Sequence, residues 1–334
     1  MTDTLAHLSN NAIYSATIVY ALAMLSHVVE WAMARQLTTN PAPAGRALVG
    51  AGGVAAKVPA TAADPAEVNG PSAPTDDDVE RSDRFGRIGL SLTVLAMLVQ
   101  AAGVVCRGLA AQRVPWGNMY EFTITASLAV AVAYIFLVRR YSIRWLGLPV
   151  TGFLTIVLGV AVIVLYRPLG PLVPALHSYW LAIHVSAAAI AGGAYTVGAL
   201  ASVLYLLKSR LEAKAAAHPG QPRIGYLWRV PPAAAIDRVA YRVHAFAFPL
   251  WTFAVLAGAI WAQYAWGRFW GWDPKEVWAF ITWVVYAAYL HARATAGWQG
   301  RAAAYVALLG FATFLFNFVG INLFGSGLHS YSGM

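Results

Sequence analysis

The chain has 334 residues, of which 59% are hydrophobic and 11% are charged, and its mean hydropathy is +0.59. This composition excludes an ordinary soluble globular domain and indicates an integral membrane protein. The net charge of +9 is then explained by membrane topology and contact with anionic lipid, and it does not indicate a nucleic-acid site. The single cysteine, Cys106, excludes a disulfide or a Cys-x-x-Cys pair within the chain, so any thiol chemistry must come from a partner.

Eight apolar segments are long enough, or nearly so, to cross a hydrocarbon core of about 30 Å. Helices are expected, because backbone groups in lipid must pair within their own segment. The predicted fold is therefore an all-α integral membrane protein with about eight transmembrane helices. The predicted spans are roughly 12–34, 88–110, 119–138, 146–166, 180–207, 246–265, 276–292 and 302–322.

The positive charges predict the orientation. Four loops carry 18 of the 23 Lys and Arg residues, so their side of the membrane is predicted to be cytoplasmic. Those loops are 35–87, 139–144, 208–242 and 293–301. With eight crossings both termini are external, and the loop 266–278, the turn 168–177 and the C-terminal tail share the outer face.

Three regions are predicted along the chain. Residues 1–35 form the first transmembrane helix, which lacks a signal-peptide cleavage pattern and is expected to be retained. Residues 36–87, rich in Ala, Pro, Gly and acidic side chains, form a disordered cytoplasmic linker. Residues 88–334 form the main membrane domain. Within it, charged and apolar residues are interleaved after Pro231 and Pro232, which predicts an interfacial helix leading into the sixth span.

Four tryptophans within thirteen residues make 266–278 the most distinctive segment of the chain. Gly267 and Gly271 alternate with its aromatic residues, an arrangement that lets a loop lie flat and present rings to a planar molecule. Tryptophan is also enriched at membrane interfaces, so a simple aromatic belt stays an alternative. The candidate ligand-contacting residues are Trp266, Arg268, Phe269, Trp270, Trp272 and Trp278.

The same loop contains a helix start. The run Asp273-Pro274-Lys275-Glu276 has an N-cap acceptor, a proline at the first helical position and a carboxylate at the third. The seventh span is therefore predicted to begin there. Asp273 has this structural explanation as well as a place among the candidate site residues.

Two histidines are predicted to reach the space over this loop. His184 lies four residues into the fifth span, about 6 Å below its outer start at a rise of about 1.5 Å per residue. His329 lies in a turn sequence after the eighth span. Two neutral imidazoles on opposite sides of a porphyrin are a standard axial pair for heme iron, which predicts a heme site. A histidine near a helix end more often only forms an interfacial hydrogen bond, and that alternative stays open.

The other histidines lie at different depths. His291 is about 20 Å deeper than the loop, so it is predicted to mark a second, inner heme position whose other ligand comes from elsewhere. His27 is predicted to pair with Glu30 at helical spacing. His177 is a candidate for an entry rim, and His7, His218 and His244 are predicted to be surface or interfacial residues.

The run from Trp266 to Ala279 resembles the tryptophan-rich WWD signature of heme-handling proteins, and in particular the CcsA/ResC family of the system II pathway of cytochrome c assembly. Four other segments also resemble motifs of that family, and the resemblance extends from about residue 88 to the C-terminus. These segments are 114–121, 180–185, 289–291 and 327–331. The long segment 36–83 departs from compact members of the family.

The resemblance implies a function and its partners. Members of the family work with a CcsB/ResB-type membrane protein, deliver heme b to the outer face, and join its vinyl groups to the Cys-x-x-Cys-His cysteines of apocytochrome c. The chain would then be a subunit of a cytochrome c heme lyase. A thiol reductant protein and membrane lipid are expected as further partners. A bacterial plasma membrane, with the active site on its external face, is favoured over a thylakoid membrane.

The resemblance also implies residue roles. His184 and His329 would be axial ligands of the external heme, and His291 would ligate an inner heme opposite a histidine of the partner. Arg268 is expected to meet a heme propionate, and His329, on its turn, is expected to be the more easily displaced ligand. The predicted catalytic set is His184, His329, Trp266, Trp270, Trp272 and Asp273.

Three alternatives stay open. A heme exporter without ligation activity would use the same residues but would not dock apocytochrome c. A bis-histidine electron-transfer subunit would place paired histidines at equal depths on facing helices. A helical interaction scaffold would retain no heme.

Overall fold

The computed structural model describes residues 1–36, 76–141, 143–171, 174–218, 225–325 and 327–329. Throughout these ranges the regular structure is helical, which confirms the predicted all-α class. The long helices are α1 (Thr2–Gln36), α2 (Asp76–Ala111), α3 (Met119–Tyr141), α4 (Gly147–Val160), α5 (Tyr179–Ala217), α6 (Ala233–Trp266), α7 (Pro274–Thr295) and α8 (Arg301–Leu315). The short elements are η1 (Arg144–Leu146), η2 (Ala161–Leu165), η3 (Pro174–Leu176), η4 (Tyr226–Trp228), η5 (Phe316–Gly320) and α9 (Ile321–Phe324).

The helices are long and apolar enough for a multi-pass membrane protein. Seven helical stretches of the described chain, comprising α1, α2, α3, η1 to η2, α5, α6 and α8 to α9, meet that condition by length and composition. The eighth predicted span, 276–292, lies within α7. This helix has 22 residues, among them Lys275, Glu276 and Arg293, and it does not meet the same condition. The crossing by α7, and with it the count of eight, stays a prediction.

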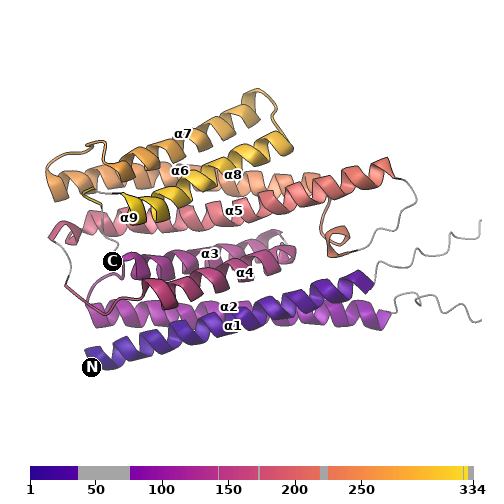
Figure 1. Cartoon of the computed structure of the whole chain (residues 1–334), viewed down its shortest axis with the longest axis horizontal. Coiled ribbons are helices and arrows are strands. Elements are labelled where there is room, and N and C mark those ends of the chain that lie inside the picture. Colours follow the sequence, from indigo (N-terminus) through magenta and orange to yellow (C-terminus); the bar gives the residue numbers. More distant parts are fainter. Residues whose placement is uncertain (37–75, 142, 172–173, 219–224, 326, 330–334) are drawn as a thin grey trace, which may run out of the picture.

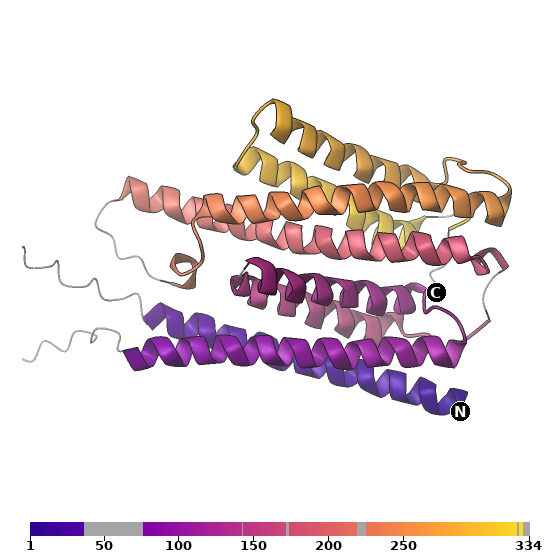
Figure 2. The same ribbon diagram turned by 180° about the vertical axis from the view of Figure 1, so that it is seen from behind.

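The helices lie side by side along one long direction (Figures 1 and 2). The pair α1 and α2 forms one side of the bundle, α7 and α8 form the other, and α3 to α6 lie between them. The N-terminus, the loop between α6 and α7, and α9 lie at the same end of the bundle (Figure 1). The bundle therefore brings together the segments that sequence analysis predicted to share one face.

Residues 76–87 of the predicted linker 36–87 are helical, contrary to the prediction of disorder for them. Residues 37–75 lie outside the described residues, but residues 76–87 already form the first turns of α2. Acidic residues at 77 and 78 favour a helix N-terminus, because they complement the helix dipole. Ser82 is fully buried and accepts a hydrogen bond from Arg229 Nη1 at 2.8 Å. Tertiary contacts thus extend the helix beyond its apolar span.

The predicted interfacial helix after Pro232 is continuous with the sixth span. It forms the first turns of α6, and Ile236 in these turns is fully buried. Asp237 accepts two hydrogen bonds from Arg293 of α7, at 2.9 and 3.0 Å. The segment is therefore packed against the bundle instead of forming a separate amphipathic element.

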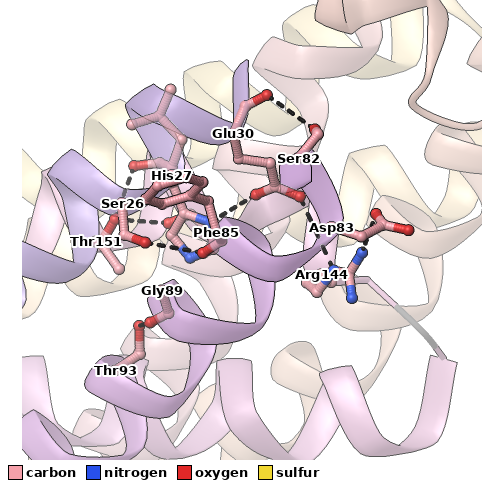
Figure 3. A network of polar contacts seen from close by, with 12 residues as sticks. Ser26, His27, Glu30, Ser82, Asp83, Phe85, Gly89, Thr93, Arg144 and Thr151 are labelled. Atoms are coloured by element: carbon pink, nitrogen blue, oxygen red, sulfur yellow. Dashed lines mark hydrogen bonds and ion pairs between the residues drawn. The ribbon is translucent and has the colours of Figure 1, made fainter. Parts of the chain in front are cut away.

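A polar network joins α1, α2 and η1 at the end of the bundle away from the α6–α7 loop (Figure 3). The predicted His27–Glu30 pair is confirmed, with Nδ1 2.9 Å from Oε2 and both side chains almost fully buried. Arg144 Nε lies 4.0 Å from Glu30 Oε1, and Arg144 Nη2 lies 3.0 Å from Asp83 Oδ1 in α2. Glu30 is buried, whereas Arg144 and Asp83 are about one-third exposed, so the network links α1, α2 and η1 through polar groups that are only partly shielded from solvent.

The prediction for His244 is wrong. Its side chain is fully buried instead of lying at a surface or interface. The ring lies 5.3 Å from the Tyr286 ring, and a Cβ at Gly198 would lie 2.6 Å from it. The helical repeat explains this placement, because Ala240 and Ala247, which share its face of α6, are also buried.

Candidate functional site: a cavity with two histidines

A cavity lies at the end of the bundle that carries the α6–α7 loop. It contains about 1160 Å³ of space, counting its open mouth, and its wall includes residues of α3, α5, α6, α7, η5 and α9. The wall is mainly apolar, as in most sites for organic ligands. Its aromatic members are Trp116, Phe122, Trp251, Trp261, Phe269, Trp270, Phe314 and Phe318.

His184 is positioned on this wall by contacts within the helix bundle. Its Nδ1 donates a hydrogen bond to the carbonyl oxygen of Ala254 in α6, at 2.7 Å. The ring lies parallel to the Trp261 ring, with centroids 6.0 Å apart. A Cβ at Gly258 would lie 2.8 Å from the imidazole, so glycine leaves the space that the ring uses. Because a carbonyl can only accept, Nδ1 carries the hydrogen and Nε2 keeps its lone pair.

His329 reaches the same cavity from the chain beyond α9. Its Nδ1 donates to Asp273 Oδ1 at 2.9 Å, and its ring meets the edges of Trp261 and Trp266 at centroid distances of 5.4 and 4.6 Å. Asp273 Oδ2 accepts from the backbone N–H of Leu328 at 2.7 Å. The Asp273 carboxylate therefore holds both the ring and the backbone beside it, and again leaves His329 Nε2 without a hydrogen.

Asp273 also begins α7, as predicted. Its Oδ1 accepts from the N–H of Lys275 at 3.2 Å, while Glu276 Oε2 accepts from the N–H of Asp273 at 3.1 Å and of Gly271 at 2.8 Å. This arrangement is the predicted capping box. The structural role of Asp273 and its contact with His329 therefore coexist, and the helix cap becomes the support of the histidine.

The protonation states of His329 and Asp273 follow from their surroundings. Burial lowers the pKa of His329 to about 4, although the adjacent Asp273 acts in the opposite direction. Burial raises the pKa of Asp273, but His329 and the N–H groups of Leu328 and Lys275 more than offset this, so that its pKa lies below the usual value. At neutral pH the pair is a neutral imidazole that donates to a carboxylate.

The aromatic residues of the loop have different positions. Phe269 and Trp270 line the cavity, and Trp266 packs behind its wall against Trp261 and His329. Trp272 is 68% exposed, has a left-handed φ of 59°, and meets the edge of Trp270. Trp278 packs on Phe316. Thus two of the predicted aromatic residues form the wall and one supports it.

The remaining predicted residues lie away from the wall. The Arg268 guanidinium folds over Gly271, where a Cβ would overlap it, and Arg268 is not among the lining residues. His291 is exposed on α7 and does not line the cavity either, and its predicted role at an inner heme stays a prediction. His177 is exposed one residue after Leu176, which lines the cavity, so its predicted place at the rim stays a prediction.

Sequence reasoning missed several wall residues. Lys275 and Glu276 were interpreted only as parts of a helix start, yet both line the cavity. Trp251 and Trp261 lie within an apolar helix and had no local signal beyond residue type. Asn118, Asn317 and Asn322 were missed too. Asn118 lies in the segment 114–121, whose resemblance to a family motif was a signal, whereas Asn317 and Asn322 offered only their positions near a helix end.

Glu121 supports another part of the wall. Its buried carboxylate accepts hydrogen bonds from Arg107 Nε at 3.1 Å, Arg113 Nη1 at 2.6 Å and the N–H of Gly117 at 2.8 Å. These bonds hold the loop that precedes α3. That loop carries the cavity residues Trp116 and Asn118.

Known proteins resemble this chain in sequence and in fold. Residues 116–329 match the family described as Cytochrome C assembly protein. Proteins named cytochrome c biogenesis protein CcsA are similar to it. That of a Synechococcus strain is 33% identical, covering 74% of this chain and 85% of the relative. The protein from Synechococcus elongatus is 36% identical, and the match covers 73% of this chain and 87% of the relative. The protein from Guillardia theta is 34% identical, and the match covers 73% of this chain and 85% of the relative.

Among solved structures, cytochrome c heme lyase CcmF has a similar fold. The TM-score is 0.57 at 16% sequence identity, and the match covers 99% of this chain and 51% of that chain. The similarity shows a shared helical architecture.

Proposed function

Because the chain belongs to the CcsA family of cytochrome c assembly proteins, we propose that its two-histidine cavity receives heme b as a substrate and presents it for attachment to apocytochrome c. One observation carries this proposal. His184 and His329 face the same cavity, and each has its Nδ1 hydrogen held by an oxygen acceptor, so both Nε2 atoms are available to a metal.

The two imidazoles of His184 and His329 suit heme iron better than a metal ion without a porphyrin. The porphyrin supplies four nitrogens, so the protein need provide only two axial ligands. Within the described ranges, no group of three or more His, Cys, Asp and Glu side chains is arranged to hold a metal ion. The flat aromatic side chains of the wall, such as Trp261 and Trp270, are suited to a planar macrocycle.

The proposed reaction adds a cysteine S–H across a vinyl C=C bond of the substrate. One C–S bond and one C–H bond form, while the S–H bond and the π bond are lost, so the addition needs no net electron transfer. The contribution of the chain is to position the substrate and shield it from water. Asp273 keeps His329 in the ligating tautomer, and the histidine of the Cys-x-x-Cys-His sequence finally replaces one protein ligand.

The proposal includes partners and a location. A CcsB/ResB-type membrane protein completes the active complex, and a thiol reductant protein keeps the cysteines of apocytochrome c reduced. His291, exposed on α7, is proposed to ligate an inner heme together with a histidine of that partner. We place the cavity on the external face of a bacterial plasma membrane, and a thylakoid membrane is the alternative, since the relatives above include cyanobacterial and algal proteins.

The first experiment is a visible spectrum of the chain purified with its partner, oxidised and then reduced with dithionite. The expected spectrum is that of low-spin, bis-histidine heme, and it should weaken in a His184→Ala/His329→Ala variant. A wild-type complex without heme, despite adequate heme supply, would contradict the proposal and favour the scaffold. Covalent heme on co-expressed apocytochrome c then distinguishes ligation from export alone.

A further inference from the structure

We propose that Lys275 binds a carboxylate of the substrate, namely a propionate group at the porphyrin edge. This inference rests on the proposed function, because it assumes that the cavity receives heme. Lys275 is the one Lys or Arg side chain among the described residues that line the cavity. Arg268, the cation that the sequence favoured for this contact, folds over Gly271 instead.

The Lys275 ammonium is held in place by an amide oxygen and makes no direct ion pair, although the nearby Asp273 carboxylate interacts with it electrostatically. Its Nζ donates to Asn322 Oδ1 at 2.8 Å, and the amide nitrogen of Asn322 donates to the carbonyl oxygen of Phe318. Within the described part of the chain, no carboxylate oxygen lies within 4.0 Å of Nζ. An ammonium group has three donors, so two remain for a ligand.

The carboxylates nearest in sequence have other partners. Asp273 accepts from His329 and Leu328, and Glu276 accepts from the N–H groups of Gly271 and Asp273 through Oε2. Glu276 Oε1 is buried without a hydrogen-bond partner in the described structure, and Glu276 also lines the cavity. Glu276 would repel a carboxylate that enters the cavity, so Lys275, the one cation on the described wall, is the group that such a carboxylate would bind.

The position of Lys275 in α7 gives no structural reason for a cation. It lies in the first turn of the helix, where the helix dipole disfavours positive charge. A half-buried ammonium that makes no direct ion pair is also costly to desolvate, and Asp273 offsets only part of that cost. A ligand carboxylate relieves both costs. Heme has two such groups, and a charge-assisted bond to one of them would orient the macrocycle between His184 and His329.

The test compares metal-free protoporphyrin IX with its dimethyl ester, because neither has an iron for the histidines to bind. Each is titrated into the chain purified with its partner, and binding is followed by porphyrin fluorescence. The wild-type complex should bind the free acid about tenfold or more tightly than the ester, the range expected for a charged hydrogen bond. Lys275→Met should remove this preference, and Lys275→Arg should retain it.

Arg268→Met is the matched control, since it removes a cation from the same loop and should leave the preference unchanged. Equal binding of acid and ester by the wild type, or an unchanged preference in Lys275→Met, overturns the inference. The wild-type comparison stands even if Lys275→Met does not fold. If the wild-type complex binds heme but does not distinguish acid from ester, the inference about Lys275 is wrong and the proposed function is intact. If it binds neither porphyrin nor heme, both the inference and the proposed function are wrong.

Discussion

At the scale of the residue, Asp273 shows how one side chain can connect folding with chemistry. The carboxylate that caps α7 also accepts the Nδ1 hydrogen of His329, so the helix start and the ligand position cannot vary independently. Hydrogen-bond partners of ligating histidines contribute strongly to metal affinity. The capping motif was visible in the sequence, but its partner lies 56 residues further along the chain.

The two roles of Asp273, capping α7 and holding His329, can be separated by comparing its replacement with that of Ser178, the N-cap of α5. Asp273→Ala should lower heme affinity by about 10-fold to 100-fold, because His329 loses its acceptor. It should also cost about 1 kcal/mol of stability through the lost cap. Ser178→Ala removes the cap of α5, where Ser178 Oγ accepts from the N–H of Trp180 at 3.2 Å, and should lower stability alone. Heme titration and thermal unfolding in detergent measure both. Equal losses of heme in the two variants would contradict the role of Asp273.

The pH dependence of the site follows from His329. Burial lowers its pKa to about 4, so the folded protein keeps this imidazole neutral, whereas an exposed histidine is protonated below about 6.5. Between these values the unfolded chain binds more protons, so the contribution of His329 to stability should fall as the pH is lowered from about 6.5 to about 4. Coordination of heme iron by His329 should survive in the same pH range. A heme spectrum that changes from low-spin to high-spin with a midpoint near 6.5 would contradict this prediction.

Residue type and position in the sequence identified His184 and His329, but not every contact in the cavity. Lys275 was hidden by its own local explanation as part of a helix start, and Arg268 was favoured because it lies among the tryptophans. Which of two neighbouring cations faces a cavity depends on the path of the loop. Here Gly267, at a φ of 73°, ends α6 and Trp272 is left-handed, and neither angle can be read from composition.

At the scale of the element, hydropathy predicted the middle of each helix and misplaced several ends. The apolar cores of all eight predicted spans lie within helices, yet α2 begins at Asp76 and α6 at Ala233, well before the apolar runs. These early turns are held by polar contacts between elements, such as Arg293 with Asp237. A search for apolar length cannot detect such pairs, because their partners are distant in sequence.

Glu121 gives a test of how polar contacts position an element. Glu121→Gln should leave Arg107 and Arg113 without a counter-charge, a loss of about 3–5 kcal/mol for a buried ion pair. It should also reduce heme occupancy, because the loop carrying Trp116 loses its anchor. Asp83→Asn is the matched control, since Asp83 and its partner Arg144 are each about one-third exposed and such pairs contribute about 1 kcal/mol or less. Thermal unfolding and heme content in detergent are the measurements. Similar effects in both variants would contradict the anchoring role.

At the scale of the whole molecule, the bundle separates two kinds of histidine. His184 and His329 come from distant parts of the chain and meet at one end of the bundle, while His291 is exposed on the side of α7. The alternation of helix direction was predictable, because consecutive spans that each cross the membrane must run in opposite directions. The grouping of α3, α5 and α6 around the cavity was not, because it depends on packing between helix faces.

The same architecture predicts which ligand yields to apocytochrome c. His184 is part of α5, with its ring bonded to Ala254 and packed beside Trp261, whereas His329 lies beyond the last helix and depends on Asp273. With imidazole supplied to load heme, His329→Ala should form more covalent holocytochrome than His184→Ala, since the retained ligand is the rigid one. Heme-stained cytochrome is the readout, and the double variant with imidazole is the control. If only His184→Ala released holocytochrome, the histidine of α5 would be the ligand that is displaced.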